Sequence, residues 1–251
     1  MLRRLSLLPL CRSTMAKPMH TKSHVVAVDK ADNTITFTPK TGHSASLVFM
    51  HGLGDTAFGW ADTMQFMSES MPHVKCILPT AQTQPVTLNH GMQCPSWYDI
   101  QSLSNRKGDP CTGIEASRDR ILQIIEKEID AGIAPSRIVL GGFSQGGALS
   151  LFTGYQMNHA LAGILVLSAY VPKADRFAVP EALKEVPLLM CHGDSDMVVQ
   201  LSWAEMSVGK VKDQGVKNVE FIVYEDLDHG ASMEEITKVK TWLQKVLPAT
   251  A

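Results

Sequence analysis

Beyond its first 24 residues, the chain alternates short apolar runs with longer segments of helical period. Residues 34–38 alternate polar and apolar side chains, which is typical of a strand with one buried face. Residues 45–50 form an apolar run that ends at His51 and Gly52, so we expect a strand in the middle of a sheet. In residues 114–129 the aliphatic side chains approximate one stripe along a helix. The pattern therefore predicts a mixture of strands and helices.

The rest of the chain repeats this order of strand and helix. Predicted strands cover residues 34–38, 45–50, 74–78, 138–141, 163–168, 187–191 and 219–224, and predicted helices cover residues 59–70, 114–129, 145–158, 201–213 and 233–247. Repeated strand–helix units with continuous apolar strands imply an α/β fold, with a mainly parallel central sheet and helices on both faces. We predict one such domain over residues 25–251. Ligands of these sheets bind at the carboxyl ends of the strands.

The first residues have a different composition. Residues 1–14 are rich in arginine, leucine and hydroxyl side chains, and no acidic residue precedes Asp29. This is typical of an organelle transit peptide. The other interpretation is a disordered tail, or an extension ahead of a translation start at Met15. A secretory leader fits less well, because the apolar core is short and contains Pro9. We assign residues 1–24 to a targeting segment or disordered tail, outside the fold.

Composition narrows the classes of function. The 251 residues include 45% hydrophobic side chains, which suits one enzyme-sized domain. The formal net charge of −2 provides no strong field for nucleic acid or acidic lipid. The five cysteines lack Cys-x-x-Cys spacing, which argues against a disulfide framework and a zinc site and favours a reducing, intracellular setting. No apolar run approaches the roughly 20 residues of a membrane-spanning helix.

A candidate nucleophile lies in the run from Gly142 to Gly146, which reads G-F-S-Q-G and separates an apolar strand from a stretch of small residues. In a strand–turn–helix context, G-x-S-x-G is typical of a nucleophilic serine, because the glycines permit a sharp turn that exposes the hydroxyl. The following helix directs N–H groups and its positive dipole end toward the place where negative charge develops. We therefore expect Ser144 to be a catalytic nucleophile.

A base should follow at a later strand end, in the order serine, acid, histidine. His229 follows the strand at residues 219–224, and histidine can take and return a proton near neutral pH. His192 and His51 are weaker candidates, since His192 precedes the acid and His51 begins a glycine-rich turn. We choose His229.

Two aspartates, Asp194 and Asp196, follow the strand at residues 187–191. The catalytic acid has to reach the imidazole and fix its tautomer, and Asp196 lies further along the loop toward that site. Asp194 is better suited to stabilise the turn by accepting from backbone N–H groups. We choose Asp196 and expect Asp226 and Asp228 to be solvated loop residues.

The turn from His51 to Asp55, which reads H-G-L-G-D, follows the predicted central strand. Its glycines let the backbone approach a ligand and aim the Leu53 N–H at a carbonyl oxygen. The Gln145 N–H, directly after the nucleophile, is the second expected donor of an oxyanion hole. The run lacks the G-x-G-x-x-G spacing, so we expect no dinucleotide site.

Several motifs between about Ala45 and Leu247 resemble the acyl-protein thioesterases, also called lysophospholipases or small carboxylesterases, of the α/β-hydrolase superfamily. The most specific are FMHGLGDT at 49–56, GW at 59–60, PVTLN at 85–89, PSWYD at 95–99, RIVLGGFSQGGALS at 137–150 and CHGDSD at 191–196. The resemblance implies the α/β-hydrolase fold. It also implies that Ser144, Asp196 and His229 are the triad and that Leu53 and Gln145 are the oxyanion positions.

The resemblance further implies the substrates: long acyl chains on cysteine thioesters of proteins, or lysophospholipids and other esters. The partners are then S-acylated proteins at cytosolic membrane faces, so the family role favours the cytoplasm, whereas a cleaved transit peptide would direct the enzyme to mitochondria. The chemistry needs no metal or organic cofactor, and none is expected. A general esterase of small esters would use the same triad, and a catalytically silent binding module would lack one of its members.

Residues 80–112 correspond to the family's loop region beside the acyl channel, and the match is partial over residues 102–111. A long acyl chain needs an apolar groove, since each buried CH₂ contributes about 0.8 kcal/mol. Leu88, Met92 and Trp97 are candidates for its lining, and ordinary loop packing explains them equally well.

Overall fold

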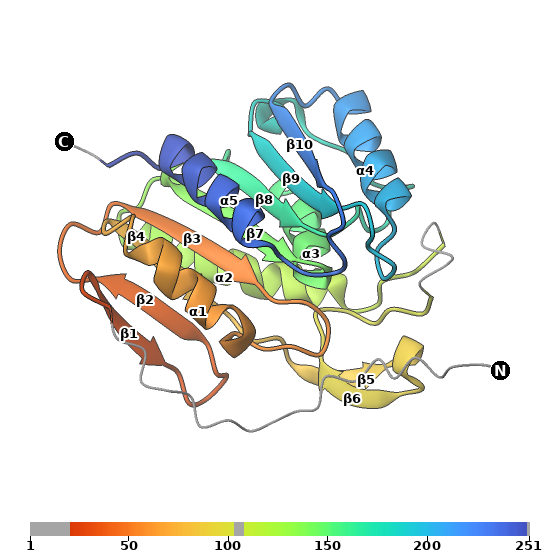
Figure 1. Cartoon of the computed structure of the whole chain (residues 1–251), viewed down its shortest axis with the longest axis horizontal. Coiled ribbons are helices and arrows are strands. Elements are labelled where there is room, and N and C mark those ends of the chain that lie inside the picture. The colour runs from red at the N-terminus through yellow and green to blue at the C-terminus, as the bar shows by residue number, and fades with distance from the viewer. Residues whose placement is uncertain (1–20, 103–107, 250–251) are drawn as a thin grey trace.

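The computed structural model describes residues 21–102 and 108–249. Residues 1–20 of the predicted targeting segment, which was assigned to residues 1–24, lie outside the described residues, whereas His24 begins the first strand of the fold. Eight strands form one sheet in the order β1-β2-β4-β3-β7-β8-β9-β10 (Figure 1). Their bounds are β1 His24–Val28, β2 Ile35–Pro39, β3 Ala45–Met50, β4 Val74–Leu78, β7 Ile138–Phe143, β8 Gly163–Leu167, β9 Leu188–Gly193 and β10 Val219–Tyr224. The six strands from β4 to β10 are parallel, and β2 and β1 continue the sheet antiparallel.

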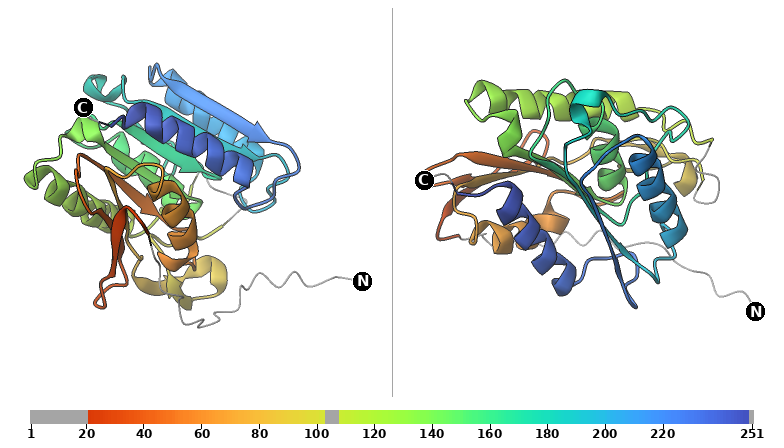
Figure 2. Two further views of the ribbon diagram at one scale, coloured as in Figure 1. Left: turned by 60° about the vertical axis from the view of Figure 1, so that its left-hand side comes forward. Right: turned by 90° about the horizontal axis from the view of Figure 1, so that it is seen from above.

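Helices cover both faces of the sheet (Figure 2). They are α1 Phe58–Ser68, α2 Ile114–Asp130, α3 Gln145–Gly154, α4 Leu201–Asp213 and α5 Met233–Val246. The first and last pack on one face, and α2, α3 and α4 pack on the other. The α/β-hydrolase architecture predicted from the sequence is confirmed.

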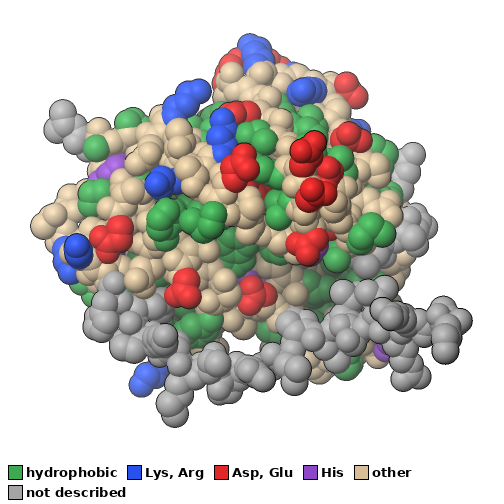
Figure 3. Space-filling model, viewed as in Figure 1, with side chains coloured by type: hydrophobic (Ala, Val, Ile, Leu, Met, Phe, Trp, Pro, Cys, Tyr) green, Lys and Arg blue, Asp and Glu red, His purple; other side chains and the backbone are tan. Residues whose placement is uncertain are grey.

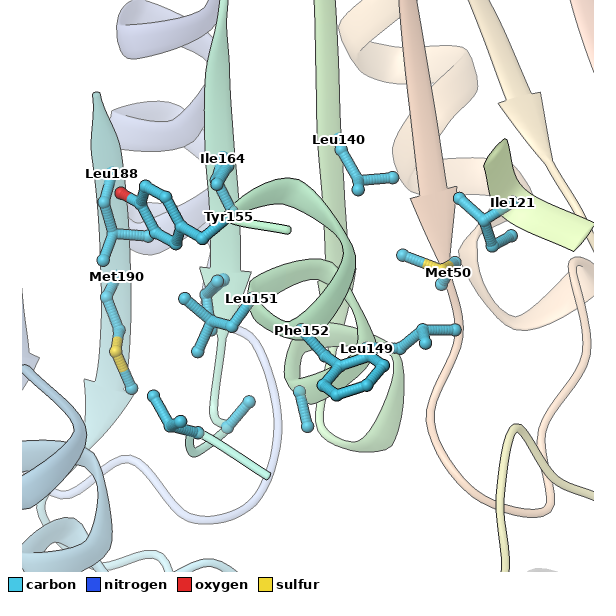
Figure 4. Close-up of a cluster of buried hydrophobic side chains, with 14 of the residues drawn as sticks. Met50, Ile121, Leu140, Leu149, Leu151, Phe152, Tyr155, Ile164, Leu188 and Met190 are labelled. Atoms are coloured by element: carbon cyan, nitrogen blue, oxygen red, sulfur yellow. The ribbon is translucent and has the colours of Figure 1, made fainter. Parts of the chain in front are cut away.

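The centre of the molecule is the core between the sheet and α3. All ten residues of α3 are buried, and its aliphatic side chains interdigitate with those of β7, β8 and β9 (Figure 4). The strand β7 is buried at every position except its last residue, Phe143, because helices cover both of its faces. This packing fixes the end of β7, where the candidate nucleophile follows.

A small two-stranded hairpin stands apart from the main sheet and was not predicted from the sequence. It consists of β5 Thr83–Val86 and β6 Met92–Pro95, joined through a 3-10 turn, η1 Thr87–Asn89. The hairpin is held to the segment that follows it, since the Leu88 N–H donates to the Ile100 carbonyl at 2.8 Å. A second bond, from the Gly54 N–H to the Pro95 carbonyl at 2.9 Å, places the hairpin beside the turn that follows β3.

Charged side chains of both signs are scattered among hydrophobic ones on the face drawn in Figure 3, and acidic groups gather on its β10 side. That face carries no concentrated basic stripe. Within the described ranges, no helix is long and apolar enough to cross a membrane.

Candidate active site

Ser144 occupies a strained turn between β7 and α3. Its backbone has φ 53° and ψ −117°, a conformation that side-chain-bearing residues rarely adopt. A Cβ on Gly142 would lie 2.4 Å from the Gly146 carbonyl carbon, and one on Gly146 would lie 2.3 Å from the Met50 oxygen. No side chain fits at either position. The G-x-S-x-G spacing is therefore a steric requirement of this turn.

The structure brings Ser144, His229 and Asp196 together from three strand ends. Ser144 Oγ lies 2.9 Å from His229 Nε2, and His229 Nδ1 lies 2.7 Å from Asp196 Oδ2. Because a carboxylate only accepts, Nδ1 carries the proton and donates it to Asp196, which leaves the Nε2 lone pair facing the serine hydroxyl. The imidazole is thus set to receive the Ser144 proton.

The Asp196 carboxylate is buried, and both of its oxygens accept hydrogen bonds. Its Oδ1 accepts the N–H groups of Val198 and Val199, each at 2.8 Å, while Oδ2 accepts from His229. Burial alone would raise the pKa of the Asp196 carboxyl, but the hydrogen bond and charge of His229 and the two backbone N–H groups together hold that pKa below its usual value. The acid is therefore ionised at neutral pH.

The other acids and histidines of these loops have different partners. Asp194 Oδ1 accepts from the Asp226 N–H at 2.9 Å and so ties the two loops together at the surface. Asp226 and Asp228 are exposed. His192 is fully buried, with Nε2 2.6 Å from the Val199 carbonyl and 3.5 Å from Asp196 Oδ2. This contact of a second histidine with the acid was not predicted from the sequence.

The two predicted oxyanion positions belong to segments next to Ser144. Gln145 is the first residue of α3, and the turn with Leu53 follows β3, the neighbour of β7. A Cβ on Gly52 would lie 3.4 Å from Ser144 Cβ, so this turn passes directly beside the serine. Within the described part of the chain, neither the Leu53 N–H nor the Gln145 N–H donates to another protein group. Both donors are available to a ligand.

The three predicted acyl-binding residues differ from one another in their surroundings. Trp97 is 1% exposed, and its indole N–H donates to the His51 carbonyl at 2.8 Å. Leu88 is half-buried on η1, and Met92 is exposed on β6. A role of these three residues in acyl binding stays a prediction.

A separate apolar cavity of about 400 Å³ lies between α4 and the segment after β8. It is lined by Tyr170, Val171, Ala174, Asp175, Trp203, Met206, Ser207 and Lys210. It is at the same edge of the sheet as the serine, because β8 ends three residues before Tyr170 and its Leu167 carbonyl accepts the Ser144 N–H at 2.8 Å. The sequence did not reveal it, since Trp203 and Met206 fit the apolar stripe of an ordinary helix. The described residues contain no cluster of His, Cys, Asp and Glu suited to a metal ion.

Residues 31–247 match the model of a family described as phospholipase/carboxylesterase. The chain belongs to this family. Among the relatives of this chain, acyl-protein thioesterase 1 homolog 1 of Dictyostelium discoideum is 44% identical over 211 residues, 83% of this chain and 93% of that protein. Acyl-protein thioesterase 1 of Neurospora crassa is 40% identical, over 83% of this chain and 89% of that protein. Members of this family are hydrolases, and so is this chain.

The similarity to acyl-protein thioesterases also holds for the three-dimensional structure. The crystal structure of Zea mays acyl-protein thioesterase 2 superimposes with a TM-score of 0.75 and 31% sequence identity. The match covers 86% of this chain and 99% of the maize chain.

Proposed function

We propose that this chain is a serine hydrolase that removes long acyl chains from protein cysteines, with Ser144, His229 and Asp196 as its catalytic triad. The observation that carries the proposal is the unbroken hydrogen-bond series from Asp196 through His229 to Ser144. The acyl-protein thioesterase names of its relatives support the substrate class.

In the first half of the reaction, His229 Nε2 takes the proton of Ser144 as Oγ attacks the thioester carbonyl carbon. Asp196 stabilises the imidazolium that forms. The Leu53 and Gln145 N–H groups hold the oxyanion. When the intermediate collapses, the C–S bond breaks, the thiolate takes the proton from His229, and the acyl group remains as an ester on Ser144.

In the second half, His229 takes a proton from water as the water oxygen attacks the ester carbonyl. The C–O bond to Ser144 breaks, and Oγ recovers its proton from His229 as the fatty acid leaves. Lysophospholipids and other carboxylic esters would react in the same way, with an alcohol in place of the thiol. We include them among the proposed substrates.

We propose that the acyl chain occupies the cavity between α4 and the segment after β8. Its volume of about 400 Å³ falls within the range of small-ligand pockets, and its apolar lining suits methylene groups. Long chains should then react with higher kcat/KM than acetyl groups, because binding of the chain positions the carbonyl at Ser144.

Two measurements test the function. Ser144→Ala should abolish hydrolysis of a palmitoyl-cysteine peptide and labelling by a fluorophosphonate probe, with an unchanged circular dichroism spectrum. Labelling that persists in this variant would place the nucleophile elsewhere. A series of acyl thioesters from C2 to C16 tests the substrate class, and activity confined to acetyl or butyryl esters would favour a general esterase of small esters.

We also propose that this enzyme acts in the cytoplasm. S-acylated proteins face the cytosol at membranes, which supports a cytoplasmic enzyme that contacts membranes transiently. Cell fractionation with N-terminal sequencing of the native protein tests this. A mature terminus between Thr14 and Thr21 in the mitochondrial fraction would contradict the cytoplasmic assignment.

A further inference from the structure

His51 stands next to the proposed oxyanion turn, and its buried ring has only one arrangement of protons that fits its surroundings. The ring is 1% exposed, and its Nε2 accepts the Ala81 N–H at 3.0 Å. A backbone N–H can only donate, so Nε2 carries the lone pair and the proton of the neutral ring is on Nδ1. Burial lowers the pKa of His51 to about 4, so the ring is neutral at physiological pH.

The proton on Nδ1 is donated to the carbonyl oxygen of Gly52, at 2.7 Å. This oxygen also accepts the Asp55 N–H at 3.2 Å. The Gly52 carbonyl and the Leu53 N–H belong to one planar trans peptide unit and point in opposite directions. Any group that fixes the carbonyl therefore fixes the direction of the Leu53 N–H.

A second set of bonds ties the same turn to the other proposed donor. The Trp97 indole N–H donates to the His51 carbonyl at 2.8 Å, and the Trp97 backbone N–H donates to Gln145 Oε1 at 2.9 Å. The Gln145 amide Nε2 donates to the Tyr98 carbonyl at 2.7 Å. Gln145 is 2% exposed. The side chains of His51, Trp97 and Gln145 thus connect the two N–H donors through one buried network.

We propose that His51 is a positioning residue that orients the Leu53 N–H for the oxyanion. Trp97 and the Gln145 side chain keep the Leu53 N–H and the Gln145 N–H in fixed positions relative to each other. The inference rests on the proposed function, since it needs an oxyanion at Ser144. His51 itself does not touch the substrate. Its effect is on the transition state, because negative charge develops on the substrate carbonyl oxygen only as Ser144 attacks.

Two substitutions by amide side chains distinguish this positioning role of His51 from a purely structural role, in which the ring only fills space in the core. In His51→Asn the side-chain amide lies near the position of Nδ1, so it can still donate to Gly52 but cannot reach the Ala81 N–H. In His51→Gln the amide lies near the position of Nε2, so it can accept from Ala81 but loses the Gly52 bond. Both variants are uncharged and lose one of the two bonds.

We expect His51→Gln to lose about 100-fold in kcat with a KM within about threefold of wild type, similar to the loss of one oxyanion donor. His51→Asn should lose less than about tenfold. A long-chain trifluoromethyl ketone, which forms an oxyanion on Ser144, should bind His51→Gln more weakly in proportion to the loss of kcat. His24→Gln, at a buried histidine in β1, controls for loss of a buried imidazole.

Equal losses in the two His51 variants, or no loss beyond threefold in His51→Gln, would overturn the proposal. If His51→Gln does not fold, the proposal is tested with Trp97→Phe, which removes the indole N–H that donates to the His51 carbonyl. An unchanged kcat in Trp97→Phe would contradict the proposal. Failure of the proposed function looks different, because wild-type protein would then hydrolyse no acyl ester or Ser144→Ala would remain active.

Discussion

At the scale of single residues, the choice between two neighbouring aspartates depends on where each carboxylate points. Asp196 is turned inward, where it meets His229 and two backbone N–H groups. Asp194 is two residues earlier and exposed, and its carboxylate joins the loops after β9 and β10. Only the former can influence the tautomer of the imidazole.

We therefore expect Asp196→Asn to lower kcat by about 10³- to 10⁴-fold, since an amide at this position favours the wrong tautomer of His229. Asp194→Asn should lower kcat by less than about tenfold, because it affects only the packing of the two loops. Steady-state kinetics of both variants with one thioester provide the comparison. Equal losses, or a larger loss in Asp194→Asn, would reverse the assignment.

The sequence was sufficient to select residues at strand ends, because the carboxyl ends of parallel strands share one edge of the sheet. It could not predict contacts that depend on loop conformation. His51 and Ala81 are 30 positions apart, and their hydrogen bond requires the loops after β3 and β4 to meet. The approach of His192 to Asp196 likewise requires the chain to fold back through Val199.

At the scale of elements, the turn between β7 and α3 leaves no room for side chains at its two glycines. Gly142→Ala or Gly146→Ala would force a methyl group into backbone atoms that belong to α3 and β3, respectively. We expect each to lower the free energy of unfolding by about 3 kcal/mol or more and to lower activity. Urea unfolding followed by fluorescence measures this. Gly209→Ala in α4, where a Cβ meets no atom within 4 Å, is the control and should not destabilise.

The helix α5 carries a pH-dependent contribution to stability. Glu235 is fully buried in its first turn, and burial raises the pKa of this carboxyl to about 7. Between about pH 4.5 and 7 the unfolded chain loses this proton while the folded chain keeps it. The free energy of unfolding therefore falls as the pH rises through this range.

Glu235→Gln should remove this fall, because the amide is neutral at every pH. Relative to wild type, the variant should gain on the order of 3 kcal/mol between pH 5 and pH 8. Urea midpoints of both proteins at the two pH values test this, since other groups titrate equally in both. A difference that does not change with pH would contradict the assignment.

Most of the elements in the main sheet could be predicted because their apolar runs are continuous or strictly periodic. The strand β3, for example, was predicted at its observed bounds. The hairpin of β5 and β6 could not be predicted, because only one of its eight strand residues is buried and β5 contains Pro85. The strand β1 was missed for a related reason: it is an edge strand with one buried residue, His24.

At the scale of the whole molecule, the proposed acyl site depends on two parts of the chain, the segment after β8 and the helix α4. Val171, after β8, donates its N–H to Ser207 Oγ on α4 at 2.8 Å and so fixes one wall of the cavity against the other. The cavity therefore has a defined depth, which should set the preferred chain length.

Ala174→Phe should shorten this cavity. We expect kcat/KM for a palmitoyl thioester to fall about tenfold more than kcat/KM for an acetyl ester, which corresponds to about two methylene groups left unburied. Ala131→Phe, on the exposed end of α2, provides the matched control. If both substrates lose activity equally in Ala174→Phe, the acyl chain binds elsewhere.

The complete burial of α3 also affects how the protein acquires its activity. A helix with no solvent-facing side is not stable by itself in water and forms only when the sheet and α2 cover it. Until then its residues, nine of which are apolar or small, are exposed and able to associate with other chains. We therefore expect refolding from urea to yield less active enzyme as the protein concentration rises. Hydrolytic activity should return no earlier than the slowest-exchanging amides of β7 and β8 become protected, because the nucleophile has no fixed position before α3 docks.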